Sequence, residues 1–253
     1  SSVYRDVAAD GEVGFHAVLN AARRAGKTEA FYRWRNAAGA ETRRAARVSA
    51  DGVASVELDV GELAEGTAPV VCELWEDGKK SGEGRLDFTR AKTLPKRRVW
   101  IDAHKRCIVD GKPFFPLGLY TGRMTPETVV AYARSPFNCV GPYGTYDKEM
   151  LDVYERHGLK VIYSLCYAPE REASYFPMLR KKVTAFAKDH PAVIGWYICD
   201  EPTLGRIPGL LAWRKEIEEM DGGDHPIWGC LAQVGDTRHF TGVFDVLGID
   251  PYP

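Results

Sequence analysis

From residue 114 onward, apolar segments with the length of β-strands alternate with segments that have the three- or four-residue spacing of helices. Parallel strands joined through helices need right-handed crossovers, which restricts the fold to an open doubly wound sheet or a TIM barrel. No phosphate-binding glycine loop follows any of these strands. The barrel is therefore favoured. The expected strands are 114–120, 137–143, 160–166, 193–199, 226–231 and 246–249. One helix is expected to begin at Thr125-Pro126-Glu127, and further helical segments are expected at 147–157, 172–188, 208–220 and 236–241.

The fourth of these strands carries the clearest chemical signal. Residues 192–199 are all apolar except Gly195, which is typical of a strand buried on both faces. The run stops at Asp200, Glu201 and Pro202, where a barrel strand reaches the rim that carries chemistry. A carboxyl group held partly in an apolar wall can donate a proton near neutral pH. The pattern predicts a general acid.

Aromatic and acidic residues also end the other strands. Aromatic rings stack on the C–H faces of sugars, and phenol groups hydrogen-bond to sugar hydroxyls. Each tyrosine alone is more often ordinary packing at the rim, but together they favour a carbohydrate ligand over a phosphate. The candidate ligand-binding residues are Asp200, Tyr120, Tyr143, Tyr167, Asp250 and Tyr252.

Residues 1–95 follow a different pattern, in which short segments of period two are separated by turns such as Asp51-Gly52 and Asp77-Gly78. One apolar and one polar face per segment predicts antiparallel strands, among them 30–35, 43–48 and 54–60, in an immunoglobulin-like β-sandwich. The basic, proline-containing stretch 89–98 predicts a linker. We therefore expect a sandwich domain with its linker at 1–95 and a barrel domain at 96–253, beginning with a hairpin of 99–103 and 106–109 closed by Asp110-Gly111.

Composition excludes several other classes of protein. The 34 basic and 35 acidic residues are balanced, which gives no reason to expect a nucleic-acid or membrane partner. No apolar run approaches the roughly 20 residues of a membrane span. The start shows no signal-peptide pattern, so secretion or a periplasmic location is favoured only by the substrate class. Six scattered cysteines without C-x-x-C spacing predict buried thiols, with no metal site and no cofactor.

Several segments resemble family 2 and related members of clan A of the glycoside hydrolases: 108–118, 137–140, 158–162, and 190–196 together with Asp200-Glu201-Pro202. The order of sandwich, linker, hairpin and barrel is similar as well, so the resemblance spans nearly the whole sequence. In that clan the fourth strand ends in Asn-Glu, and its glutamate is the acid/base of a retaining mechanism. The resemblance implies this role for Glu201. It places Tyr252 where many members keep a tyrosine that orients the nucleophile.

Two positions depart from that pattern. Asp200 stands where the clan has an asparagine that hydrogen-bonds to the sugar 2-hydroxyl. An ionised carboxylate cannot donate, so Asp200 is protonated, accepts from the hydroxyl, or makes no contact with it. Gly141, Pro142 and Tyr143 occupy the place of the arginine that family 2 enzymes carry on the second strand. Substrate preferences are therefore not transferred from the family.

A retaining glycosidase needs a second carboxylate about 5–5.5 Å from the first, and the clan places it on the seventh strand. The stretch from residue 96 holds six strand–helix units, whereas a full barrel takes roughly 250 residues. We therefore expect the nucleophile beyond residue 253, the missing strands from the remainder of the same protein, and no activity from residues 1–253 alone. Turnover by this chain alone would point to another nucleophile, such as Asp250.

Three functions remain open at this point. The first is a retaining glycoside hydrolase that acts on an oligo- or polysaccharide. The second is a non-catalytic carbohydrate-binding protein on the same fold, in which Asp200 marks the loss of catalysis. The third is a lyase or aldolase, which is disfavoured because no strand ends in a lysine and no metal ligands cluster in the sequence. For Glu201 itself, the alternative to catalysis is a structural carboxylate that caps the next helix.

Overall fold

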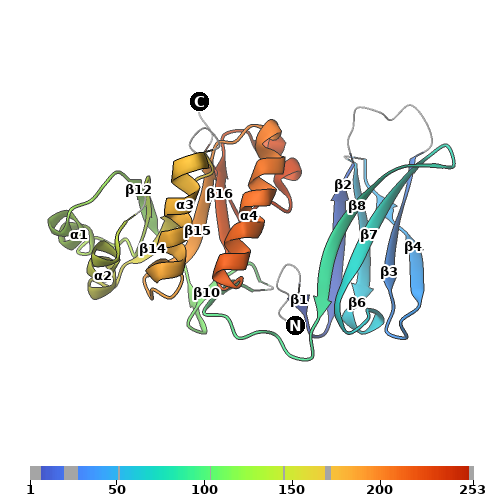
Figure 1. The fold of residues 1–253 in the computed structure, drawn as a ribbon, viewed down its shortest axis with the longest axis horizontal. Coiled ribbons are helices and arrows are strands. Elements are labelled where there is room, and N and C mark those ends of the chain that lie inside the picture. The colour runs from blue at the N-terminus through green and yellow to red at the C-terminus, as the bar shows by residue number, and fades with distance from the viewer. Residues whose placement is uncertain are drawn as a thin grey trace. The chain divides into compact units, whose positions relative to one another are not determined.

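The computed structural model describes residues 7–19, 28–50, 52–102, 104–144, 146–168 and 172–250. The chain divides into two compact units, Ser1–Lys96 and Arg97–Pro253. Each unit has a hydrophobic core of its own. The colour gradient of Figure 1 follows the chain from the strands of the first unit to the helices and strands of the second.

The first unit consists of two sheets that share one core (Figure 1). The larger sheet has the order β1-β8-β7-β3-β4, and the smaller has the order β2-β6-β5. Neighbouring strands are antiparallel except β1 and β8, which are parallel. The elements are β1 Val7–Ala8, β2 Glu12–Val18, β3 Thr28–Arg35, β4 Glu41–Ala45, β5 Arg47–Val48, β6 Val53–Asp59, the 3-10 turn η2 Val60–Glu62, β7 Gly66–Glu76 and β8 Lys79–Arg90.

Alternation along the strands builds the core of this unit. On β3, Ala30, Tyr32 and Trp34 are buried, whereas the residues between them are partly exposed. The hydroxyl of Tyr32 donates to the carbonyl oxygen of Ala54 on β6 at 2.9 Å. A buried phenol thus finds its acceptor on the opposite sheet and links the two layers.

The stretch 43–48, expected as one strand, is two. Strand β4 pairs with β3, while β5 pairs with β6 of the other sheet. Between them, Ala46 donates its N–H to the carbonyl oxygen of Ala30 at 2.8 Å. The chain changes sheets at Ala46, and the alternation of residue types does not reveal this because both halves keep the same period of two.

A three-stranded antiparallel sheet opens the second unit, with β9 Val99–Ile101, β10 Cys107–Val109 and β11 Lys112–Phe114. The Asp110-Gly111 turn was expected to close the pair β9 and β10, but it connects β10 to β11. Its φ angles of 50° and 77° suit a two-residue hairpin turn. Strands β9 and β10 are joined by a loop in which the Asp102 carboxylate accepts the N–H groups of His104 and Arg106.

Six parallel strands form the main sheet of the second unit in their order along the chain (Figure 1). Each strand lies next to the strand that precedes it in the chain, as in a curled barrel-type sheet. In a doubly wound sheet the order of the strands reverses at one point. The strands are β12 Gly118–Thr121, β13 Cys139–Pro142, β14 Lys160–Ser164, β15 Val193–Asp200, β16 Ile227–Leu231 and β17 Val246–Ile249. The helical elements are α1 Pro126–Tyr132, α2 Lys148–Arg156, α3 Glu172–Lys182, the π-helical turn η4 Val183–Ala187, η5 Leu204–Arg206, α4 Ile207–Asp221 and η6 Val234–Phe240.

Local signals set the ends of the helices. Thr125 caps α1 by accepting the N–H of Thr128, and Pro126 occupies the first turn, as the sequence predicts. Gly222 follows α4 with a φ of 71°, which favours glycine at this position. The helix expected over 172–188 ends earlier as regular α-helix, and its last turn is the π-helical η4.

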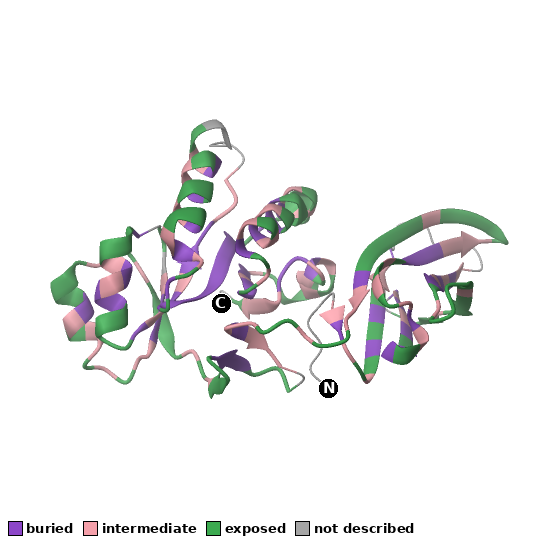
Figure 2. Cartoon of the chain, turned by 60° about the horizontal axis from the view of Figure 1, so that its bottom comes forward, coloured by how far each residue is buried: buried purple, intermediate pink, exposed green. Residues whose placement is uncertain are grey.

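Strand β15 is the most deeply buried strand of the sheet. Residues 193–199 are all buried, as Figure 2 shows by the continuous purple of this strand. Side chains of the covering helices complete the core beside it, among them Leu179 of α3 and Trp213 of α4. The prediction of a strand buried on both faces is confirmed.

The two edge strands of the sheet are β12 and β17. Leu119 on β12 and Ile249 on β17 are among the exposed large apolar residues. Among the described residues, no helix has the length and apolar character needed to cross a membrane.

Candidate active site

The C-terminal ends of the six parallel strands share one edge of the sheet, and the candidate residues gather there. Tyr120 lies on β12, Tyr143 directly follows β13, and Asp200 ends β15 with Glu201 next to it. Asp250 follows β17, and its backbone N–H donates to the carbonyl oxygen of Leu231 at 2.9 Å. These residues are exposed at the rim, and among the strands that carry them β15 is buried along its length up to Cys199.

A β-bulge near the end of β15 decides which way the two acids face. Tyr197 pairs with Trp228 and Cys199 pairs with Gly229, so Ile198 is an extra residue without its own partner on β16. Strict alternation would put residues 197 and 200 on opposite faces of the sheet. With the bulge, Asp200 faces the same side as Tyr197.

The hydroxyl of Tyr197 donates to Oδ1 of Asp200 at 2.6 Å. Tyr197 is buried, whereas Asp200 is exposed at the rim. Burial and then the hydrogen bond to the carboxylate raise the pKa of Tyr197 well above its usual value. The phenol therefore stays protonated and remains a donor to Asp200 at neutral pH.

Glu201 directly follows β15 and has a φ of 45°. This angle lies in the left-handed region, which few residues other than glycine, asparagine and aspartate adopt. Its backbone N–H donates to the carbonyl oxygen of Cys230 on β16 at 2.9 Å, which holds this turn in place. Strained backbone that neighbouring structure maintains is concentrated at functional sites. The adjacent Asp200 and Glu201 therefore do not continue a regular strand.

Three tyrosines form a row across the inner side of the sheet at this rim. The ring centroid of Tyr120 lies 5.4 Å from that of Tyr143 and 5.4 Å from that of Tyr197. Burial raises the pKa of Tyr120 to about 12. Gly141 on β13 leaves room for the ring of Tyr120, because a Cβ at that position would lie 3.3 Å from this ring, a tight contact.

Three carboxylates at the rim act on the thiol of Cys230. Burial raises the pKa of its thiol, and the carboxylates of Asp200, Asp250 and Glu201 raise it further. The same three carboxylates add to the effect of burial on the pKa of Tyr143. The acids of β15 and β17 are therefore close enough to act on the same groups.

Two of the predicted residues are not brought into this group. Tyr167 packs toward the helices, where its ring stacks on Phe176 of α3 with centroids 5.7 Å apart and its hydroxyl contacts the backbone at Gly209 of α4. Phe176 in turn stacks on Trp213, so Tyr167 belongs to the packing of the outer layer. Tyr252 lies outside the described residues.

Sequence reasoning missed Tyr197. Its position within an apolar run predicts a core residue, and only the bulge brings Asp200 to the side of the strand on which its hydroxyl lies. A buried phenol needs an acceptor, and an acid three residues further on is the one signal that could have identified the pair.

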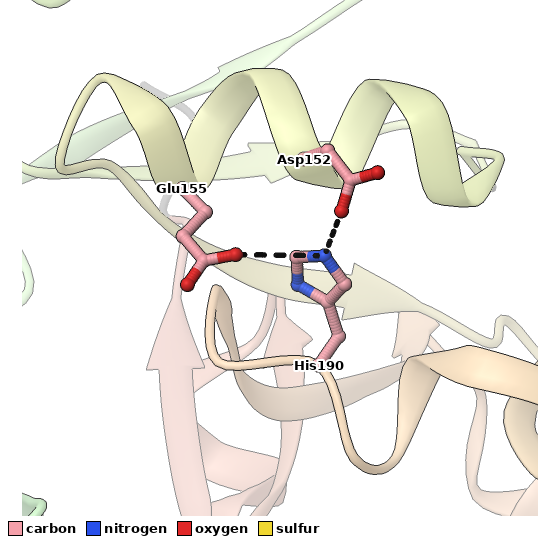
Figure 3. A group of neighbouring side chains, drawn as sticks. All are labelled: Asp152, Glu155 and His190. Atoms are coloured by element: carbon pink, nitrogen blue, oxygen red, sulfur yellow. Dashed lines mark hydrogen bonds and ion pairs between the residues drawn. The ribbon is translucent and has the colours of Figure 1, made fainter.

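A second group of carboxylates lies at the opposite end of β15 (Figure 3). Nε2 of His190 lies 3.0 Å from Asp152 and 3.9 Å from Glu155, both on α2. Three such ligands could hold a metal ion, but Nδ1 of His190 accepts the N–H of Ala192. The proton of the neutral imidazole is then on Nε2, which donates to Asp152. Lys148 binds both carboxylate oxygens of Asp152 at 2.8 Å, so the group is a structural link between α2 and the start of β15.

No family model matches the sequence, and a search of curated proteins finds no match. Among solved structures, the chain is similar to a family 2 glycosyl hydrolase from Bacteroides cellulosilyticus DSM 14838, with 17% identity, a TM-score of 0.52, and coverage of 99% of this chain and 38% of that one. It is also similar to a β-glucuronidase from Parabacteroides merdae, with 12% identity, a TM-score of 0.50, and coverage of 100% and 36%.

The chain therefore spans less than half the length of these solved structures. At these identities the likeness concerns the fold alone. The fold is similar to part of a family 2 glycosyl hydrolase structure, and it consists of two stacked sheets in the first unit and a barrel-type parallel sheet in the second.

Proposed function

We propose that the chain is part of a retaining glycoside hydrolase that acts on an oligo- or polysaccharide, with Glu201 as the general acid/base. The observation that carries this proposal is the position of Glu201. It follows a fully buried parallel strand, in a strained conformation, at a rim shared with Asp200 and Asp250. Catalytic carboxylates occupy such rims in barrel enzymes. The first unit is proposed to be an immunoglobulin-like accessory domain.

In this mechanism Glu201 first donates a proton to the oxygen of the leaving sugar. A second carboxylate attacks the anomeric carbon at the same time and forms a glycosyl-enzyme ester. Glu201, now ionised, takes a proton from the water that hydrolyses this ester and is protonated again for the next cycle. The tyrosine row offers phenol groups and aromatic faces for the sugar beside the acids.

We propose that the second carboxylate lies beyond residue 253, on strands that close the sheet between β17 and β12. These edge strands expose apolar residues, Leu119 and Ile249 among them, and exposed apolar edges are ordinarily covered. The span of under half the length of similar solved structures supports the same conclusion. The missing strands would come from the remainder of the same protein.

The test uses the full-length protein and 2-deoxy-2-fluoro glycosides, which trap the ester on the nucleophile. A labelled carboxylate outside residues 1–253 is expected. Glu201→Ala should lose activity on substrates with poor leaving groups and regain turnover with azide, because azide attacks the ester without help from a general base. Labelling of Asp250 instead would show that this chain carries the nucleophile itself. Sugar binding without label or turnover would favour a non-catalytic carbohydrate-binding protein, for which Asp200 in place of asparagine is the supporting observation.

A further inference from the structure

Arg98 lies close to the point where the second unit begins. Its guanidinium donates to the carbonyl oxygens of His190, Pro191 and Val193 at the start of β15. It also lies 2.8 Å from Nε2 of His225, in the turn between α4 and β16. One side chain thus connects the segment that enters the second unit to two strands of the parallel sheet.

The imidazole of His225 is uncharged in this arrangement. Its Nδ1 lies 2.8 Å from Oδ1 of Asp221, the last residue of α4, and both side chains are 1% exposed. A guanidinium carries only N–H donors, so Nε2 is the acceptor toward Arg98 and the single ring proton is on Nδ1. The ring of Trp196 on β15 lies edge-on beside the imidazole, with centroids 5.1 Å apart. His225 therefore accepts from Arg98 and donates to Asp221 in a buried site.

Protonation of His225 changes only one of these two contacts. It adds an N–H at Nε2, which then faces the N–H groups of Arg98 at a distance that requires an acceptor. Two positive charges also repel each other strongly where water is excluded. The imidazolium still donates from Nδ1 to the carboxylate of Asp221. A proton on His225 therefore breaks the contact with Arg98 and keeps the contact with Asp221.

The charged groups around Arg98 do not replace the imidazole. Burial lowers the pKa of the guanidinium, and four nearby carboxylates oppose this effect: Asp110, Asp224, Asp221 and Asp189. Within the described part of the chain, none of them forms an ion pair with Arg98. Lys160 on β14 adds positive charge and donates to the carbonyl oxygen of Pro191, which Arg98 also uses. A side chain of Arg97 lies against the same turn, 3.2 Å from the Cβ position of Gly223. Arg98 is therefore bound by neutral acceptors.

We propose that His225 is an acid-sensitive switch for the segment that connects the two units. When it is uncharged, it accepts from Arg98 and helps to hold this segment against the parallel sheet. When it is protonated, it binds Asp221 alone, and the hold of Arg98 on the segment weakens. The change falls within about pH 5–8, the range in which histidine is the side chain that changes charge. The switch does not depend on the proposed glycosidase activity.

Hydrogen exchange of the full-length protein, followed by mass spectrometry at pH 7.5 and 5.5, tests the switch. The readouts are the amides of 97–102 and the N–H of Asp110, which donates to the carbonyl oxygen of Arg98 at 2.9 Å. After correction for the intrinsic dependence of exchange on pH, their exchange should rise about five- to thirtyfold in acid, as expected for the loss of one hydrogen bond. Residues 193–199 of β15 should stay protected at both pH values. Equal corrected exchange of 97–102 at the two pH values would overturn the proposal.

The matched variant is His225→Gln. Its amide oxygen can accept from Arg98 and its amide N–H can donate to Asp221, but it takes up no proton at pH 5.5. The segment 97–102 should therefore exchange in acid as it does at pH 7.5. The buried His190 is unchanged in this variant, so a response to acid that persists would come from another group and would refute the role of His225.

Two further variants complete the design. Arg98→Gln removes the guanidinium, so exchange of 97–102 should be fast at both pH values and no longer respond to acid. A response of wild-type size in this variant would show that Arg98 is not the group that His225 controls. His157→Gln changes an exposed histidine after α2 and should behave as the wild type does. A loss of the response in His157→Gln would also contradict the assignment to His225.

Discussion

Carboxylates lie near both ends of β15, but their surroundings differ. At the start of the strand, Asp152 is bound by Lys148 and by His190. At the end of the strand, no ion pair between described residues involves Asp200 or Glu201, and the contacts are a phenol, a thiol and a strained turn. Compensated charges serve stability, whereas acids without cationic partners cost stability and are retained for chemistry.

The largest expected effect is a loss of activity on substitution at the end of β15 and none on substitution near its start. Glu201→Gln in the full-length protein should lower kcat on substrates with poor leaving groups by about 10²- to 10⁴-fold, the usual contribution of a general acid/base. Glu155→Gln makes the same chemical change at the other end of the strand and should leave kcat unchanged. Similar rates for wild type and Glu201→Gln would remove the proposed role of Glu201.

A substitution at the start of β15 should change stability, although substitutions there should not change activity. His190 is buried and hydrogen-bonds to both Asp152 and the N–H of Ala192. His190→Ala should lower the free energy of unfolding by about 2–3 kcal/mol, measured by urea denaturation, because buried hydrogen-bonding groups lose their partner. His157→Ala, on the exposed histidine after α2, is the control and should cost little. Equal effects of the two variants would show that the link at the start of β15 contributes nothing.

A smaller effect tests whether the strained turn itself costs stability. Asparagine adopts positive φ more readily than other residues with a Cβ, so Glu201→Asn should raise the free energy of unfolding by about 0.5–1 kcal/mol relative to Glu201→Gln. Both variants remove the charge, and only the tolerance for φ differs. If the two variants unfold at the same urea concentration, the turn is not a site of stored strain.

The smallest effect is a dependence on pH at the start of β15. Hydrogen bonds from Lys148 and then from His190 lower the pKa of Asp152 below its usual value. A lowered pKa stabilises the folded state above the unfolded value of about 3.9, and this contribution is lost as the pH falls through the lower folded value. Asp152→Asn should therefore flatten the stability curve below about pH 4. If the free energy of unfolding of Asp152→Asn depends on pH as that of the wild type does, Asp152 is not the source of this pH dependence.

The features that depend on residues close together in the chain could be predicted from the sequence. The six parallel strands, the Thr125 cap and the buried run of β15 rest on periodicity and on local hydrogen bonding, and the structure contains all of them. That Tyr120 and Tyr143 share a rim follows from the common direction of the strands.

Features that depend on pairing between distant segments did not follow. The bulge at Ile198 exists only through the register of β15 with β16, so the sequence does not show that Tyr197 and Asp200 lie on the same face of the strand. Tyr167 follows the strand expected at 160–166 as the other tyrosines follow theirs, but β14 ends at Ser164. Tyr167 packs on Phe176, and Gly209 leaves room for its hydroxyl. The switch at Ala46 depends in the same way on partners in two sheets.

Arg98 connects the segment that opens the second unit to residues much later in the chain. The six strands lie side by side in the order of synthesis, so each strand–helix unit can dock on the one made before it. The guanidinium of Arg98 instead donates to the carbonyl oxygens of His190, Pro191 and Val193 and lies 2.8 Å from Nε2 of His225. These partners emerge from the ribosome more than ninety residues later. The contacts that hold the segment opening the unit therefore form only after the start of β15 has been made, and a nascent chain that ends before β15 leaves Arg98 without these acceptors.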